Sequence, residues 1–189
     1  MGITGFFTVA LCVAGVVAAG SGAHAATRES GALASSSAAK RFTNPVLGPG
    51  QDPSVVTFGG WYYFTQSSPD TKYITIRRAR SIKSLAAAVK HVVWRGGRAG
   101  SPCCEWWAPE LHRVNGRWFI YTTADNGNNN NHRLQVLEAS RPLGPYTYKG
   151  QLTTPGETWS IDPSPLRLPN GRLFLFWSGW PGTTNGVQE

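Results

Sequence analysis

Residues 52–64 read DPSVVTFGGWYYF, with an Asp-Pro pair at the start, Gly59-Gly60 in the middle and an aromatic run from Trp61 to Phe64. A Gly-Gly pair accepts the positive φ angles of a tight hairpin turn, and aromatic residues favour β-strands. The stretch therefore predicts two antiparallel strands that are joined at Gly59-Gly60.

The same pattern occurs twice more, at residues 108–121 (APELHRVNGRWFIY) and 162–177 (DPSPLRLPNGRLFLFW), with Asn-Gly at the turn. The copies start about 55 residues apart, and an alternating strand follows the first two, at residues 73–76 and 134–137. About four strands in a repeat of this length is typical of a β-propeller blade. The alternative is a β-sandwich in which Pro and Gly recur by coincidence.

Composition favours an all-β fold. The 189 residues are 41% apolar and 12% aromatic, while 22 Gly and 13 Pro interrupt long helices. Only 15% of the residues are charged, which excludes a disordered, highly charged chain. A propeller usually closes with four to eight blades, and the sequence holds two full repeats and the start of a third. We therefore expect a piece of a longer protein, with exposed apolar edges around Phe174 and Phe176.

The N-terminal residues predict secretion. The apolar residues 6–19 are too few to span a bilayer, and Ala23-His24-Ala25 is a small-x-small cleavage pattern. We expect a signal peptide at 1–25, a flexible Ser/Ala-rich leader at 26–40 and a partial propeller domain at 41–189. The protein is then extracellular, a monomer and not bound to a membrane.

The chain is basic, with 18 Lys plus Arg against 10 Asp plus Glu and a net charge of +8. The cations are spread along the chain, which favours acidic wall polysaccharide over nucleic acid as a partner. Cys12 lies in the signal peptide, which leaves the adjacent pair Cys103 and Cys104. These two can bond to each other, stay as thiols or pair with partners outside this sequence.

Four motifs in order carry a resemblance to a known family: Asn44 to Leu47 with Asp52-Pro53-Ser54, Trp107 to His112, Asn128 to Arg133, and Trp159 to Asp162. Together they resemble glycoside hydrolase family 43 over about residues 42–188. Within it, the sequence is most similar to secreted α-L-arabinofuranosidases that act on arabinan or arabinoxylan. The resemblance implies a five-bladed propeller, of which this chain would cover about two and a half to three blades.

The resemblance also implies an inverting active site at the propeller axis, where a general base activates a water molecule. By motif match Asp52 would be that base, and Asp162 would orient the acid and raise its pKa. The proton donor of the family is a Glu in a Glu-x-Pro motif, which this sequence lacks. We therefore expect the chain by itself to be inactive or nearly so. Glu110 occupies the repeat position of Ser54 and Ser164, not that of the two Asp residues, so we expect its side chain to point elsewhere and to act structurally.

Each of these residues also has a purely structural interpretation. Asp before Pro commonly caps a turn, although equivalent positions in separate repeats favour a shared site for Asp52 and Asp162. The side chains that the resemblance places on substrate are Trp107, Trp159, Trp180 and His132. Packing is the alternative for the tryptophans, and a satisfied surface histidine is the alternative for His132.

The leading hypothesis is hydrolysis of terminal α-L-arabinofuranosyl bonds in plant cell-wall polysaccharide. A β-D-xylosidase of the same family, a non-catalytic carbohydrate-binding propeller and a protein-interaction propeller are the alternatives. We expect a polysaccharide or oligosaccharide substrate and no cofactor. A structural calcium occurs in the family with ligands partly on later blades, and we assign no metal ligand in this sequence.

Overall fold

The structure is a computed structural model that describes residues 44–180. The expected signal peptide, the leader and Cys12 lie outside the described residues, as do both ends of the expected domain. Nearly all described secondary structure is β-strand. The only helices in this part of the chain are 3-10 turns of three residues, η1 (Ile82–Ser84), η2 (Asn129–Asn131) and η3 (Pro155–Glu157). No helix among the described residues is long and apolar enough to cross a membrane.

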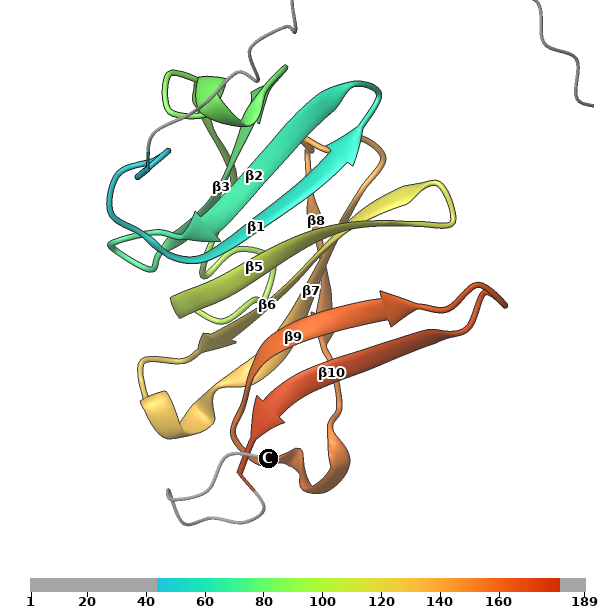
Figure 1. The fold of residues 1–189 in the computed structure, drawn as a ribbon. Coiled ribbons are helices and arrows are strands. Elements are labelled where there is room, and N and C mark those ends of the chain that lie inside the picture. Colours follow the sequence, from blue (N-terminus) through green and yellow to red (C-terminus); the bar gives the residue numbers. More distant parts are fainter. Residues whose placement is uncertain (1–43, 181–189) are drawn as a thin grey trace, which may run out of the picture. The chain divides into compact units, whose positions relative to one another are not determined.

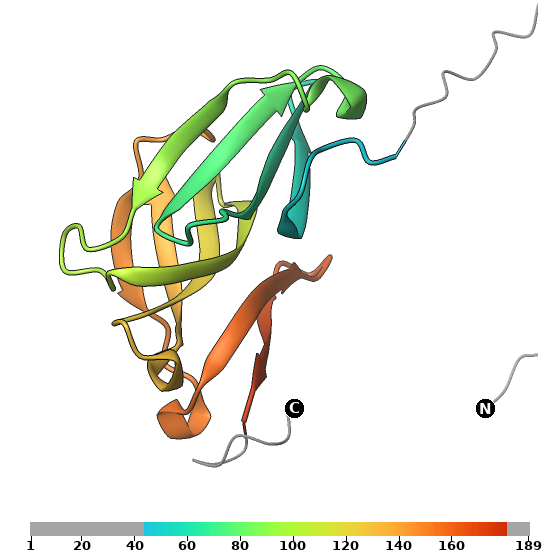
Figure 2. The same ribbon diagram turned by 90° about the vertical axis from the view of Figure 1, so that its left-hand side faces the viewer.

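The strands form three antiparallel sheets whose strands follow one another in sequence order (Figures 1 and 2). The first sheet contains β1 (Gln51–Phe58), β2 (Trp61–Ser67), β3 (Tyr73–Ala79) and β4 (Lys90–Arg95). The second contains β5 (Cys104–Val114), β6 (Arg117–Asp125), β7 (Arg133–Ala139) and β8 (Thr147–Gln151). The third pairs β9 (Ser160–Arg167) with β10 (Leu173–Gly179). Two complete four-stranded blades and two strands of a third confirm the expected all-β propeller repeats.

The predicted hairpin turns are confirmed in their backbone geometry. Between β1 and β2, Gly59 and Gly60 have φ angles of 58° and 73°, and between β5 and β6 Asn115 and Gly116 have 48° and 81°. Residues other than Gly and Asn rarely adopt these backbone angles. The turn chemistry read from the sequence therefore fixes where each hairpin reverses.

The start of each repeat shares an unusual backbone conformation. Asp52, Ala108 and Asp162 all precede a proline and have φ angles of 53°, 42° and 54°. Positive φ is uncommon for any residue other than glycine, so its recurrence at equivalent positions argues against a coincidental sandwich. The three strands that carry these residues, β1, β5 and β9, lie beside one another (Figure 1).

The main hydrophobic core joins the first two blades. Ile74, Trp106, Ile120 and Leu137 are each fully buried there. Trp118 of β6 packs across the blade boundary against Phe58 and Tyr63 of the first sheet. The buried residues of this core are Tyr63, Ile74, Ile76, Trp94, Trp106, Leu111, Trp118, Ile120, Ala124, Leu137, Ala139 and Tyr146. In β10, Phe174 and Phe176 are 37% and 57% exposed, as the repeat predicted. Both complete blades thus contribute to one shared core, the second with more residues than the first.

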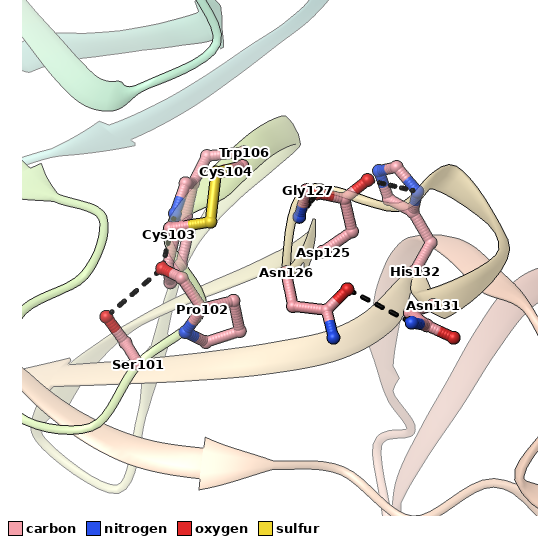
Figure 3. Close-up of a disulfide and its surroundings, with 10 residues drawn as sticks. All are labelled: Ser101, Pro102, Cys103, Cys104, Trp106, Asp125, Asn126, Gly127, Asn131 and His132. Carbon is pink, nitrogen blue, oxygen red and sulfur yellow. Dashed lines mark hydrogen bonds and ion pairs between the residues drawn. A yellow bond between two sulfur atoms is a disulfide. The ribbon is translucent and has the colours of Figure 1, made fainter.

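Cys103 and Cys104 form a disulfide with each other (Figure 3). The bond stands at the entry of β5, where Cys104 pairs with Asp125 of β6. Two register shifts follow, one on each side of Trp107, and Glu105 has a positive φ of 50°. Of the states that the sequence left open, the structure therefore contains the vicinal disulfide. The bulged strand behind it bends and re-aims its side chains.

Candidate active site

The two aspartates singled out by the sequence are brought within electrostatic range of each other. Desolvation by surrounding protein raises the pKa of Asp162 above its ordinary value, and the negative charges of Asp52 and Glu110 raise it further. Asp52 enters from β1 and Asp162 from β9, strands that lie on either side of β5. The equivalent repeat positions therefore converge on one site, although they are 110 residues apart in sequence.

Ser67 at the end of β2 orients Asp52. Its hydroxyl donates to Oδ2 of Asp52 at 2.5 Å and accepts from the backbone N–H of Ala108 at 2.8 Å. Asp52 is thereby tied to the second blade through one buried side chain. The sequence analysis missed Ser67. The signal that could have found it is the hydroxyl at the same repeat position, Thr123, which donates to the backbone of Ser160 in the third sheet at 3.0 Å.

Glu110 lies closer to the aspartates than its strand position predicted. Its Oε2 accepts from Oγ of Ser164 at 3.1 Å, and it lies 2.8 Å from Nε2 of His112. Its charge also raises the pKa of Asp162. The expectation that its side chain points elsewhere was wrong, because Glu110 stands two residues after Ala108, the repeat counterpart of Asp52 and Asp162, and strand alternation does not turn such a residue to the other face. The structural part of the expectation stands, since Glu110 bridges the second and third sheets.

The four residues expected to contact substrate form a continuous row of rings. The Trp107 and His132 ring centroids are 4.0 Å apart, His132 and Trp159 are 6.2 Å apart, and Trp159 and Trp180 are 4.2 Å apart. The last pair is nearly parallel, with 8° between the planes. Trp107 and Trp180 at the ends are half-buried, whereas His132 and Trp159 in the middle are buried. Only the ends of the row can present a ring face to a sugar.

His132 is fixed from one side by its own loop. Nδ1 lies 3.0 Å from the carbonyl oxygen of Asn129. It also lies 3.4 Å from Oδ2 of Asp125 (Figure 3). Asp125 is itself buried and accepts from the backbone N–H of Gly127. The Asn-rich run is exposed and forms the short η2 turn, capped by Asn128, that delivers His132. The surface interpretation of His132 was wrong: the ring is fully buried under Trp107.

A pocket of about 470 Å³ opens beside Asp52, between the first two blades. Gln51 and Ser67 from the first sheet and Glu105 and Trp107 from β5 line it. Oε2 of Glu105 accepts from Nε1 of Trp107 at 2.9 Å, so the two side chains form one wall. The chain enters this wall directly from the Cys103–Cys104 disulfide. We call this cavity the Trp107 pocket; its size fits a small-molecule site.

Trp180 borders a second pocket, of about 370 Å³, between η3 and β10. Phe176, Trp177 and Gly179 of β10 also line it. The row of rings thus runs from the Trp107 pocket to this one, across the second and third sheets. Within residues 44–180 no three His, Cys, Asp or Glu side chains gather as a metal site would require.

Comparisons with known proteins agree with this arrangement. The family model of glycosyl hydrolases family 43 matches residues 42–188. The α-L-arabinofuranosidase 43 of Humicola insolens is 34% identical over 164 residues, which are 85% of this chain and 34% of that protein. An extracellular exo-α-(1→5)-L-arabinofuranosidase of Streptomyces chartreusis is 33% identical over 77% of this chain and 46% of its own length.

A solved structure agrees as well. The α-L-arabinofuranosidase of Lactobacillus brevis superposes with a TM-score of 0.70 and 31% identity, over 77% of this chain and 49% of that one. The chain thus spans between about a third and a half of the length of these relatives. A family match across most of the chain, the repeated blades and the paired aspartates lead to one conclusion: the chain belongs to glycosyl hydrolases family 43.

Proposed function

We propose that the protein serves in the inverting hydrolysis of terminal α-L-arabinofuranosyl bonds, with Asp52 as general base and Asp162 as the carboxylate that tunes the acid. The observation that carries the proposal is the convergence of two aspartates on one site, where Asp52 helps to raise the pKa of Asp162. An inverting glycosidase needs a carboxylate that activates water and a carboxylic acid that protonates the leaving group, and a further nearby carboxylate keeps that acid protonated.

The geometry at Asp52 suits a general base. Oδ2 is held by Ser67, while Oδ1 makes no hydrogen bond to another described residue. In the proposed step a water molecule attacks the anomeric carbon and passes its proton to Oδ1 of Asp52. The glycosidic C–O bond breaks as the new C–O bond forms, so the sugar configuration inverts.

The leaving oxygen needs a proton from a general acid when it belongs to a sugar. The sequence contains no Glu-x-Pro motif, so no residue of this chain is assigned to that step. Asp162 would act on such an acid by its charge, since a nearby carboxylate disfavours ionisation of a second carboxyl group. We therefore keep the expectation that the 189-residue chain by itself does not release arabinose from polysaccharide.

Substrate recognition would use the ends of the aromatic row. Trp107 is half-buried and lines the pocket next to Asp52, where a furanose ring could pack on its face. His132 and Trp159 are buried and would support this surface rather than contact the sugar. Two relatives are named as extracellular exo-α-(1→5)-L-arabinofuranosidases. We propose the same substrate, arabinan, and secretion for this protein.

The test uses a substrate that needs no general acid. The purified chain is incubated with 2,4-dinitrophenyl α-L-arabinofuranoside, whose leaving group departs without protonation, and the product is followed by NMR. We expect release of the inverted β-anomer, no release from arabinan, and loss of the reaction in Asp52→Asn. A matched β-D-xylopyranoside tests the xylosidase alternative.

Three outcomes would contradict the proposal. A rate that is equal in Asp52→Asn would exclude Asp52 as the base. Retention of configuration would exclude the single displacement. Binding of arabino-oligosaccharide in calorimetry, with no turnover of the activated substrate, would favour a non-catalytic carbohydrate-binding propeller.

A further inference from the structure

A separate pocket lies at the far end of β1 from Asp52. It encloses about 310 Å³ where the β1–β2 turn meets the segment that joins β7 to β8. Phe58 and Leu143 give it an apolar lining. Six residues of extended strand separate Phe58 from Asp52, which corresponds to about 20 Å. This pocket, which we call the arginine pocket, is therefore remote from the aspartate site.

Arginines from both complete blades gather at the arginine pocket. Arg78 of β3 and Arg141, which follows β7, both line it. The guanidinium group of Arg113 lies 4.8 Å from the centre of the Phe58 ring. All three side chains are exposed, and none forms an ion pair with a carboxylate of the described residues.

Several other basic side chains of the first two blades already have ion-pair or hydrogen-bond partners. Arg117 and Lys149 both pair with Glu138, at 2.8 and 3.1 Å. Arg77 donates to the carbonyl oxygens of Leu85, Ala86 and Ala88. The charge of Glu138 is thus taken up by Arg117 and Lys149. Three guanidinium groups without a counter-charge create a positive potential that attracts an anion.

We propose that the arginine pocket binds a uronic acid unit of an anionic polysaccharide. A guanidinium group matches a carboxylate with two parallel hydrogen bonds, and arginine is the residue best suited to that geometry. The cavity volume suits one sugar ring, and its apolar lining suits the C–H faces of that ring. The ligand would be held between two blades without occupying the Trp107 pocket.

Nucleic acid fits this surface less well. The neighbouring aromatic side chain, Trp61, has the guanidinium groups of Arg78 and Arg80 at 4.3 and 3.7 Å from its ring centroid. A ring that is covered by cations is not offered for base stacking, which single-stranded nucleic acids require. The arginines also surround one pocket instead of following a stripe.

The experiment measures binding of the full chain to polygalacturonate, with neutral arabinan and fully methyl-esterified pectin as controls. The variant R78Q/R141Q removes both arginines that line the pocket. The matched control is R167Q/R172Q, which removes the same charge from the β9–β10 hairpin, where Arg172 lies 4.7 Å from the Phe174 ring centroid. Circular dichroism and thermal melting verify that both variants fold, and R141Q alone is a milder third variant.

We expect binding to polygalacturonate that weakens by about tenfold in R78Q/R141Q and at about 0.5 M salt, and that persists in R167Q/R172Q. Equal loss in both double variants would mean unspecific attraction to net charge and would overturn the proposal. Equal arginine-dependent binding of a DNA duplex would identify a nucleic-acid surface instead, and undiminished binding by R78Q/R141Q would exclude the pocket. The experiment measures binding and not turnover, so its result can be interpreted even if the proposed catalytic function is wrong.

Discussion

The repeat starts in β1 and β5 share a left-handed backbone but differ in chemistry. Asp52 and Ala108 both precede proline with φ angles of 53° and 42°. Asp52 is exposed, whereas Ala108 is buried and 7% exposed. The unusual conformation therefore belongs to the blade repeat, and the carboxylate is added to it in only some blades.

The comparison shows that the left-handed conformation does not by itself mark a catalytic residue. A left-handed conformation costs a residue other than glycine about 1–2 kcal/mol. Strained residues often mark functional sites, but Ala108 has the same strain and no reactive group. Ser67 joins the two positions, since one hydroxyl contacts the carboxylate of Asp52 and the backbone N–H of Ala108. Four substitutions test the comparison.

Loss of the carboxylate in the first blade should have the largest effect. In Asp52→Ala, hydrolysis of the dinitrophenyl arabinofuranoside should fall by about 10²- to 10⁴-fold, because no base activates the water. Added formate or azide should restore part of the rate. Ala108→Ser, which alters the equivalent position in the second blade, should leave the rate unchanged. A large loss in Ala108→Ser instead would show that the two positions are not chemically distinct.

Ser67→Ala should have the next largest effect, because it removes the hydroxyl that links Asp52 to Ala108. It leaves the N–H of Ala108 without its partner in a buried place, which costs about 1–3 kcal/mol of unfolding free energy. Urea denaturation measures the change. Ser68→Ala is the control, since its hydroxyl donates to the exposed Asp70 and should contribute less. Equal destabilisation by both would refute the bridging role of Ser67.

Replacement of Asp162 should have a smaller effect on stability, and that effect should depend on pH. Its folded pKa lies above the ordinary value of 3.8, so its ionised form disfavours the fold. Stability should therefore decrease as pH rises from about 3.8 through the raised pKa. Asp162→Asn should stabilise the protein above that range, by less than about 1 kcal/mol because the side chain is exposed, and have no effect below it. Carbon NMR of the carboxyl group should show the Asp162 pKa falling in Asp52→Asn.

Ala108→Gly should have the smallest effect on stability, and unlike Ser67→Ala it should stabilise the protein. Glycine removes the left-handed strain but gives up chain entropy, so a net gain of about 0.5 kcal/mol in unfolding free energy is expected. Ala139→Gly is the control, because Ala139 is buried in β7 and its φ is not positive. That variant should lose stability. A loss in Ala108→Gly would show that the backbone at this position is not strained.

The elements that sequence predicted best are those that local chemistry decides. Gly59-Gly60 and Asn115-Gly116 mark the hairpins because few other residues tolerate positive φ, and alternation in residues 73–76 and 134–137 marks β3 and β7. The fourth strands, β4 and β8, carried no comparable signal. Lys90–Arg95 and Thr147–Gln151 are edge strands with much exposed side chain, so little hydrophobic patterning is imposed on them.

The candidate site was predictable only where the repeat itself reveals it. Asp52 and Asp162 share a register in separate repeats, and this register implied their convergence. Glu105 gave no such signal, because its contact with Trp107 depends on the bulges in β5. The repeat did carry a signal for Ser67, a hydroxyl at the same position as Thr123, but the sequence analysis did not use it. Glu110 was placed wrongly because it stands two residues after Ala108, so strand alternation does not turn it away from the aspartates.

By itself, the sequence determined the repeat, the hairpin turns and the pair of equivalent aspartates, because turn conformation and strand alternation are local properties of the chain. Only the tertiary structure decided that Asp52 raises the pKa of Asp162, that His132 is buried beneath Trp107, and that Arg78 and Arg141 line one pocket. Each of these depends on distances between separate strands or loops, and blade packing sets those distances, not residue order.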